Sequence, residues 1–258
     1  MNSKQVDIVV LILLLGLASV YSYFTQGYFI GKALFSGAIF TLVPAFYLGY
    51  REKKCWKKII VATLVFGLVF GFFFELVSEY TGSYSVVSHV FPKIIGILPF
   101  DNVLGHMMMT FLTIMFYEHF VDRKKSSYIS KNIFFAPVPA VIVIFFSLVL
   151  IRFLPDVFFT KHLYFYMGIL AILPAIFLGI TRPKFIKDIS VTALYFFILY
   201  FVIEIFAVKF RWWIYPGDNY IGKVTIFNLT FPFEELFFWM MFYAASLVSY
   251  YELFVDES

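Results

Sequence analysis

The sequence predicts an all-α integral membrane protein of about eight transmembrane helices, built as two tandem four-helix repeats in parallel orientation. Three observations lead to this prediction. The chain is 62% hydrophobic and only 14% charged, whereas a soluble domain has about 25% charged residues. It contains several apolar runs close to the roughly 20 residues that a helix needs to cross a bilayer. A pattern of motifs also recurs at a shift of about 130 residues.

The apolar runs place the expected spans in order along the chain. The first run is longer than the apolar core of a signal peptide and has no small-residue cleavage site after it, so we expect it to be retained as a span. The eight runs cover residues 6–24, 30–50, 59–78, 100–120, 132–153, 163–180, 189–208 and 232–253.

Basic residues gather in three of the loops between these spans. With eight spans, all three loops lie on one side of the membrane together with both termini, and the positive-inside rule makes that side cytoplasmic. Three basic residues between 209 and 223 fall on the other side and run against the rule. The three clusters are Arg51, Lys53, Lys54, Lys57 and Lys58; Arg123, Lys124, Lys125 and Lys131; and Arg182, Lys184 and Lys187.

The repeat is visible when the chain is compared with itself. Residues 42–49 (LVPAFYLG) match residues 172–179 (ILPAIFLG), and each copy is followed by a basic loop and a span that ends near a glutamate, Glu75 or Glu204. Each half then closes with a Pro-Phe-acidic step, 99–102 (PFDN) or 232–235 (PFEE). We therefore expect two repeats, 1–125 and 126–258. The alternative is a chance likeness between apolar helices.

Several carboxylates lie at the expected membrane depth, where ionisable groups are costly and usually functional. Glu234 and Glu235 begin a helix, where a capping role is the simpler alternative; because adjacent residues point about 100° apart, at most one faces a given cavity. Glu75 and Glu204 lie near helix C-termini, where the macrodipole disfavours them. With Asp101, these groups are expected to converge near the outer face. Crowded like charges cannot all ionise, so at least one is expected to keep its proton and act as an acid.

Aromatic residues make up 23% of the chain, and most of them are expected to face lipid or the interface. Those next to the acidic steps are candidates for substrate binding, because ring faces stabilise a carbocation; anchoring of the helix ends is the alternative. His106, about one turn after Asp101-Asn102, either shares the proton network of that step or satisfies a local backbone group. The candidate substrate-binding residues are Trp212, Trp213, Tyr215, Phe233, Phe237, Tyr84, Asn102 and His106.

The sequence offers little for metal or cofactor chemistry. Cys55 is the single cysteine, and no pair of histidines stands with a carboxylate at metal-ligand spacing. The chain also lacks a glycine-rich phosphate loop and a serine nucleophile elbow. We predict no metal and no cofactor. The expected partners are a lipophilic polyprenyl or carotenoid substrate and membrane lipid, not nucleic acid; the oligomeric state is left open.

The motif at residues 232–238 (PFEELFF) resembles the Pro-x-Glu-Glu-x-x-Phe signature of the membrane-embedded lycopene cyclase family, in its heterodimeric or fused tandem-domain form. The resemblance covers roughly residues 40–120 and 170–254. In the first half, Asp101-Asn102 stands where the second half has Glu-Glu. The resemblance implies a tandem of multi-helix repeats and an acid-initiated cyclisation of a polyene without redox change. It implies that Glu234 and Glu235 are the essential acidic pair and that Glu204 supports them.

Two other functions remain open from the sequence. A carotenoid hydratase would use the same acid but let water capture the cation, so its product would be one water heavier than its substrate. A proton-coupled transporter or lipid-binding protein would use buried carboxylates to carry protons. A scaffold in which the acidic steps act only as caps is a further alternative.

Overall fold

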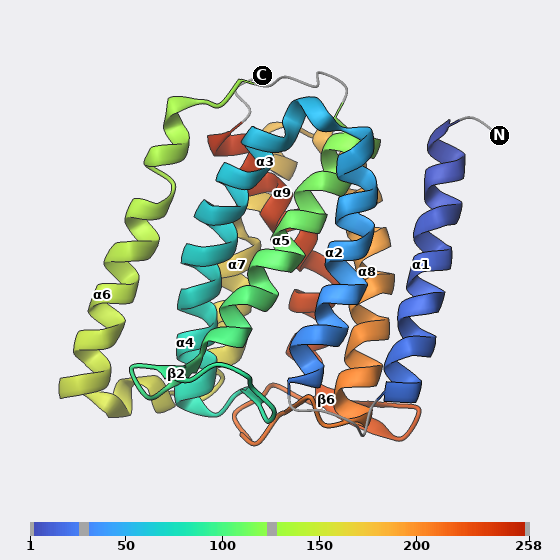
Figure 1. The fold of residues 1–258 in the computed structure, drawn as a ribbon. Coiled ribbons are helices and arrows are strands. Elements are labelled where there is room, and N and C mark those ends of the chain that lie inside the picture. The colour runs from blue at the N-terminus through green and yellow to red at the C-terminus, as the bar shows by residue number, and fades with distance from the viewer. Residues whose placement is uncertain (1–2, 26–30, 123–127, 256–258) are drawn as a thin grey trace.

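The computed structural model describes residues 3–25, 31–122 and 128–255 (Figure 1). Arg123, Lys124 and Lys125 of the second predicted basic cluster lie outside these residues. The first part of the chain forms α1 (Ser3–Thr25), α2 (Lys32–Arg51), the short η1 (Lys53–Cys55), a continuous helix made of α3 (Trp56–Ala62), the π-helical η2 (Thr63–Phe70) and α4 (Gly71–Thr81), and α5 (Phe100–Phe120).

The second part of the chain follows a similar order of helices. It contains the short η3 (Lys131–Phe134), α6 (Pro137–Phe153), the short η4 (Pro155–Phe159), α7 (Leu163–Thr181), α8 (Phe185–Lys209), the π-helical η5 (Glu235–Phe242) and its continuation α9 (Tyr243–Phe254). Each of the eight predicted apolar runs coincides, within a few residues, with one of these helical segments.

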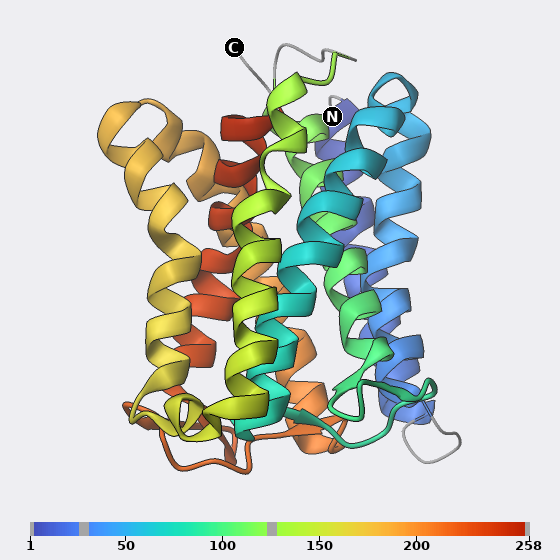
Figure 2. The ribbon, with the colours of Figure 1, turned by 90° about the vertical axis from the view of Figure 1, so that its left-hand side faces the viewer.

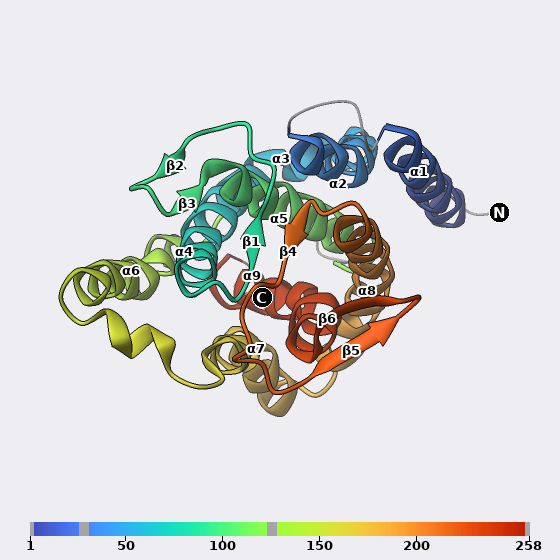
Figure 3. The same ribbon diagram turned by 90° about the horizontal axis from the view of Figure 1, so that it is seen from below.

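Six helical segments within the described residues are long and apolar enough to cross a membrane. They are Ser3–Thr25, Lys32–Arg51, Lys53–Thr81, Lys131–Phe153, Leu163–Thr181 and Phe185–Lys209. This finding confirms the prediction of an all-α, multi-pass membrane protein, although not the predicted number of eight spans. The other two segments, α5 and η5 with α9, carry buried carboxylates and lie near the centre of the bundle (Figure 3).

The two ends of the helix bundle differ in character (Figures 1 and 2). One end carries the start of α1, the end of α9 and the turns that follow α2 and α7, which contain basic residues. The opposite end carries every described strand. Apolar side chains cover the outer helices; Leu17 of α1 and Phe145 of α6 are both more than half exposed. Such a surface suits lipid, which is as apolar as the side chains that face it.

Three two-stranded antiparallel sheets form the strand-bearing end. β1 (Ser85–Val86) pairs with β4 (Trp213–Ile214), and this pairing joins the two parts of the chain. The other two sheets are hairpins: β2 (Lys93–Ile94) with β3 (Leu98–Pro99), and β5 (Lys223–Ile226) with β6 (Leu229–Pro232). β3 runs directly into α5, and two residues separate the end of β6 from the start of η5. Each hairpin therefore delivers one of the two acidic steps to the start of a central helix.

Candidate active site

A cavity of about 160 Å³ lies between the central helices and the strand-bearing loops. Side chains from α2, α4, α5, α7, α8, η5 and α9 border it, and residues around β1 and β4 form its floor. Its border contains four carboxyl groups but, among the residues that the structure describes, no lysine or arginine. The four are Glu75, Asp101, Glu204 and Glu235.

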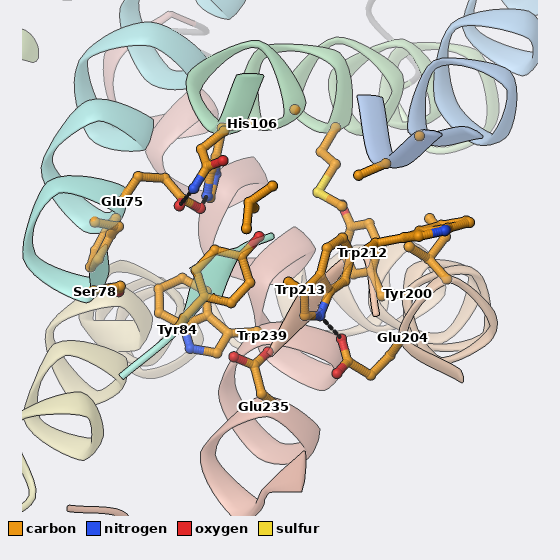
Figure 4. A pocket seen from close by; sticks show the side chains of 18 of the residues that line it. Glu75, Ser78, Tyr84, His106, Tyr200, Glu204, Trp212, Trp213, Glu235 and Trp239 are labelled. Carbon is orange, nitrogen blue, oxygen red and sulfur yellow. Dashed lines mark hydrogen bonds and ion pairs between the residues drawn. The ribbon is translucent and has the colours of Figure 1, made fainter. Parts of the chain in front are cut away.

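Glu235 is the first residue of η5, and its side chain turns into the cavity (Figure 4). The hydroxyl of Tyr164, on α7, donates a hydrogen bond to Glu235 Oε1. The Tyr215 hydroxyl also lies within hydrogen-bonding reach of the same carboxyl group. Glu235 is only 7% exposed, so protein groups rather than water surround it.

Glu204 lies on α8 at the same side of the cavity as Glu235 (Figure 4). Two loop residues hold it: the Tyr215 hydroxyl donates to Oε1 at 2.7 Å, and Trp213 Nε1 donates to Oε2 at 3.1 Å. Trp213 belongs to β4, so the β1–β4 pairing fixes the position of this donor. Both oxygens of Glu204 therefore accept hydrogen bonds, as an ionised carboxylate does.

Glu75 and His106 form a second polar cluster at another side of the cavity (Figure 4). Glu75 Oε1 lies 2.8 Å from His106 Nε2, and Glu75 Oε2 accepts a 2.6 Å hydrogen bond from Asn102 Nδ2. His106 Nδ1 lies 3.1 Å from the hydroxyl of Tyr243 on α9. His106 thus shares a hydrogen-bond network with Asn102 through Glu75, and its contact with Tyr243 links the two central helices through side chains.

The carboxylates of Asp101 and Glu234 both accept hydrogen bonds from backbone amides of neighbouring loops. Asp101 accepts hydrogen bonds from the backbone amides of Val90 and Phe91 at 2.8 and 2.9 Å. Glu234 is fully buried and accepts a 2.7 Å bond from the backbone amide of Ile221. Asp101 still borders the cavity, whereas Glu234 does not. The two adjacent glutamates therefore differ: one enters the cavity and the other tethers the loop before it.

The predicted aromatic residues also divide between the cavity and its surroundings. Tyr84, Trp212, Trp213 and Tyr215 border the cavity, as do Asn102 and His106. Phe233 and Phe237 do not border it; their rings stack on each other with centroids 5.7 Å apart.

Five further aromatic residues border the cavity but were not predicted: Phe74, Tyr164, Tyr200, Trp239 and Tyr243. Trp239 and Tyr243 follow Glu235 by four and eight residues, so helical spacing from the acidic step was a usable signal for both. Tyr164 and Tyr200 come from other helices, and no motif near them in the sequence marks their contact with the site.

Two tyrosines at the floor of the cavity keep their protons over a wide pH range. Burial, reinforced by the Glu75 and Glu79 carboxylates, raises the pKa of Tyr84 well above its ordinary value. Burial likewise raises the pKa of Tyr215, and Glu204 adds to the effect. Both phenols are therefore neutral hydrogen-bond donors at physiological pH.

The site as a whole combines acids, aromatic faces and an apolar wall, with most of its charge-bearing groups of one sign. Within the described ranges, no group of three or more histidine, cysteine, aspartate or glutamate side chains is arranged to hold a metal ion.

Comparison with known proteins found no matching family model, no matching curated protein and no matching solved structure.

Proposed function

We propose that this chain is a membrane terpenoid cyclase, similar in reaction to lycopene cyclases, that protonates an alkene of a long polyprenyl or carotenoid chain and closes a ring without redox change. One observation carries the proposal: Glu235 and Glu204 meet around Tyr215 in a cavity bordered by aromatic rings and by no lysine or arginine of the described chain. This is the arrangement that a buried Brønsted acid needs.

The hydrogen-bond donors and acceptors around Tyr215 support Glu235 as the acid. A phenol has one proton to donate, and Tyr215 donates it to Glu204 at 2.7 Å. Its oxygen can then accept a bond only from a donor, and the protonated form of Glu235 supplies one. Two carboxylates so close together in a dry site also do not both ionise at low cost. The proton therefore resides on Glu235, and Glu204 is its ionised neighbour.

The aromatic border suits the cation that protonation would create. Protonating a trisubstituted alkene gives a tertiary cation, which ring faces stabilise through their quadrupoles and which water would capture. Tyr84 of the loop before β1, Trp213 of β4 and Trp239 of η5 surround the space in front of Glu235 (Figure 4). Preorganised groups of this kind stabilise charge as it develops, without rearrangement of solvent.

Eight spans in two parallel repeats are part of the proposal. β1 and β4, which follow Glu75 and Glu204 at similar distances along the chain, pair antiparallel with each other, as two copies related by a twofold axis do. Both hairpins turn through two residues of positive φ, Ile95-Gly96 and Phe227-Asn228. Asp101 and Glu234, the first acids of the two steps, both accept loop amides. With the basic turns cytoplasmic, the cavity lies toward the outer face.

Expression in a host that accumulates lycopene tests the function. We expect conversion of the pigment to a product of identical mass that has one ring more and one carbon–carbon double bond fewer for each closure, detected by chromatography, absorption and mass spectrometry. Glu235→Gln should leave the pigment as lycopene at an equal amount of protein in the membrane. A product heavier by one water would favour a hydratase, and conversion undiminished in Glu235→Gln would exclude that residue as the acid.

A further inference from the structure

The first half of the chain contributes its own chemistry to the cavity, in a form that the second half lacks. When Pro99 is aligned with Pro232, His106 falls on Trp239 and Thr110 on Tyr243. The imidazole is therefore present on one side only, next to the step where Asp101-Asn102 replaces Glu-Glu. The two sides of the cavity carry different reactive groups, an acid on one and an imidazole on the other.

The structure assigns to Tyr243, His106 and Glu75 the role of a proton-accepting relay that ends the reaction; this inference rests on the proposed function. In this assignment the Tyr243 hydroxyl takes the proton from the substrate, which makes Tyr243 the catalytic residue, and His106 and Glu75 act through it. The acid Glu235 and this relay border the same cavity from different sides, so one group gives a proton and another takes one.

The hydrogen bonds determine the direction of the relay. A carboxylate only accepts, so the 2.8 Å contact between Glu75 and His106 places the imidazole proton on Nε2. Nδ1 of the neutral ring is then an acceptor, and the Tyr243 hydroxyl, 3.1 Å away, donates to it. This order leaves the Tyr243 oxygen with lone pairs for a proton that comes from the cavity.

The surroundings keep the relay in this geometry. Asn102 Nδ2 donates to the second oxygen of Glu75 at 2.6 Å, which holds the carboxylate in place. A glycine on α4 makes room for the imidazole: a Cβ on Gly71 would lie 2.7 Å from Cβ of His106. Thr110 Oγ1, 3.5 Å from the Tyr243 hydroxyl, borders its other side. The imidazole thus packs tightly between α4 and α9.

The step balances in protons and electrons. In the ring-closed cation, a C–H bond next to the charged carbon breaks and its electron pair forms the new carbon–carbon double bond. The proton goes to the Tyr243 oxygen as the hydroxyl proton of Tyr243 passes to His106 Nδ1. The resulting imidazolium faces the Glu75 carboxylate. Glu235 has lost one proton and His106 has gained one, and exchange with water after product release resets both.

Product analysis of three purified variants tests the relay, with lycopene as the probe in detergent-solubilised protein. In Tyr243→Phe and in His106→Asn, Glu235 still protonates the substrate, but the cation loses its proton elsewhere or captures water. We expect the rate of forming the wild-type alkene to fall by roughly 10²-fold, the lower end of the range for a general base, while other isomers or a hydrated product appear. Tyr243→Phe removes one hydroxyl and keeps the ring, so it tests the relay even where His106→Asn does not fold.

Tyr250→Phe on the same helix is the matched control and should give the wild-type product at the wild-type rate. Tyr250 packs on Phe70 with ring centroids 4.9 Å apart and does not border the cavity that contains Glu235. Wild-type product ratios and rates in both Tyr243→Phe and His106→Asn would overturn the relay and leave the proposed function standing. A wild-type protein that makes no ring from lycopene would overturn both.

Discussion

The Tyr215 hydroxyl donates a 2.7 Å hydrogen bond to Glu204 and lies within hydrogen-bonding reach of Glu235, so one loop residue connects two helical carboxyl groups. Tyr215 follows β4, which the first half of the chain holds through β1. The position of the proposed acid site in one half therefore depends on a strand pair that joins both halves. Both parts of the chain must therefore be folded together for Tyr215 to reach its position in the site.

Replacing Tyr215 by phenylalanine should slow ring formation without loss of the fold. The ring remains in the cavity, but Glu204 loses the donor to one oxygen and Glu235 loses the acceptor for its proton. We expect a decrease of roughly 10²-fold in initial rate, as for removal of one preorganised donor. Conversion of lycopene by purified protein measures this; a rate within twofold of wild type would show that the bridge is not needed.

The two adjacent glutamates should respond differently to the same substitution. Glu235→Gln removes the acid and should abolish ring formation. Glu234→Gln keeps a carbonyl oxygen that can accept the bond from the Ile221 amide, so activity should stay within about tenfold of wild type, although the new buried amide costs about 1–3 kcal/mol of stability. Initial rates and thermal unfolding of both variants decide this. Equal loss of activity at equal stability would place Glu234 in the chemistry as well.

Thiol labelling should reveal the orientation of the bundle. The single native cysteine, Cys55, is fully buried, so a new cysteine gives a clean signal. Phe227→Cys, at the exposed turn between β5 and β6, should react with a membrane-impermeant reagent in intact cells. Lys184→Cys, at the exposed turn after α7, should react only after the membrane is opened. The reverse pattern would invert the proposed topology.

Alkaline pH should destabilise the folded protein through Tyr84. Because the fold raises the pKa of Tyr84 above its ordinary value, the native state binds this proton more tightly than the unfolded state does. The resulting stabilisation is complete below the unfolded pKa of about 10 and is lost as pH rises from there toward the raised pKa. Unfolding midpoints in detergent from pH 8 to 11 should fall less steeply for Tyr84→Phe than for wild type. Tyr50→Phe, on an exposed ring, should follow wild type.

The sequence was sufficient to predict the helices and the elements that carry the acids. Apolar runs of the right length locate the helices because burial in lipid acts on every residue of a span. The repeated Pro-Phe-acidic step also predicts where both central helices begin, because in each case it lies at the junction between a hairpin and the helix that follows. These features are predictable from one sequence because they depend on neighbouring residues or on a regular spacing, not on contacts between distant parts of the chain.

The roles of individual side chains in the site were not predictable in the same way. Spacing shows that at most one of Glu234 and Glu235 faces a cavity but does not tell which one, because the answer depends on the Ile221 amide beyond the hairpin. Tyr164 reaches Glu235 from α7, 71 residues away along the chain. In a chain with 18 tyrosines and 37 phenylalanines, one aromatic residue of the site does not stand out from those that face lipid.

Deuterium incorporation tests the central claim most directly. Purified protein is incubated with lycopene in D₂O, and the product is analysed by mass spectrometry and NMR. If Glu235 delivers an exchangeable proton that starts ring closure, the product carries one deuterium for each ring formed and is otherwise isomeric with lycopene. A cyclic product without deuterium, or a labelled product that also contains an added water, would contradict acid-initiated cyclisation.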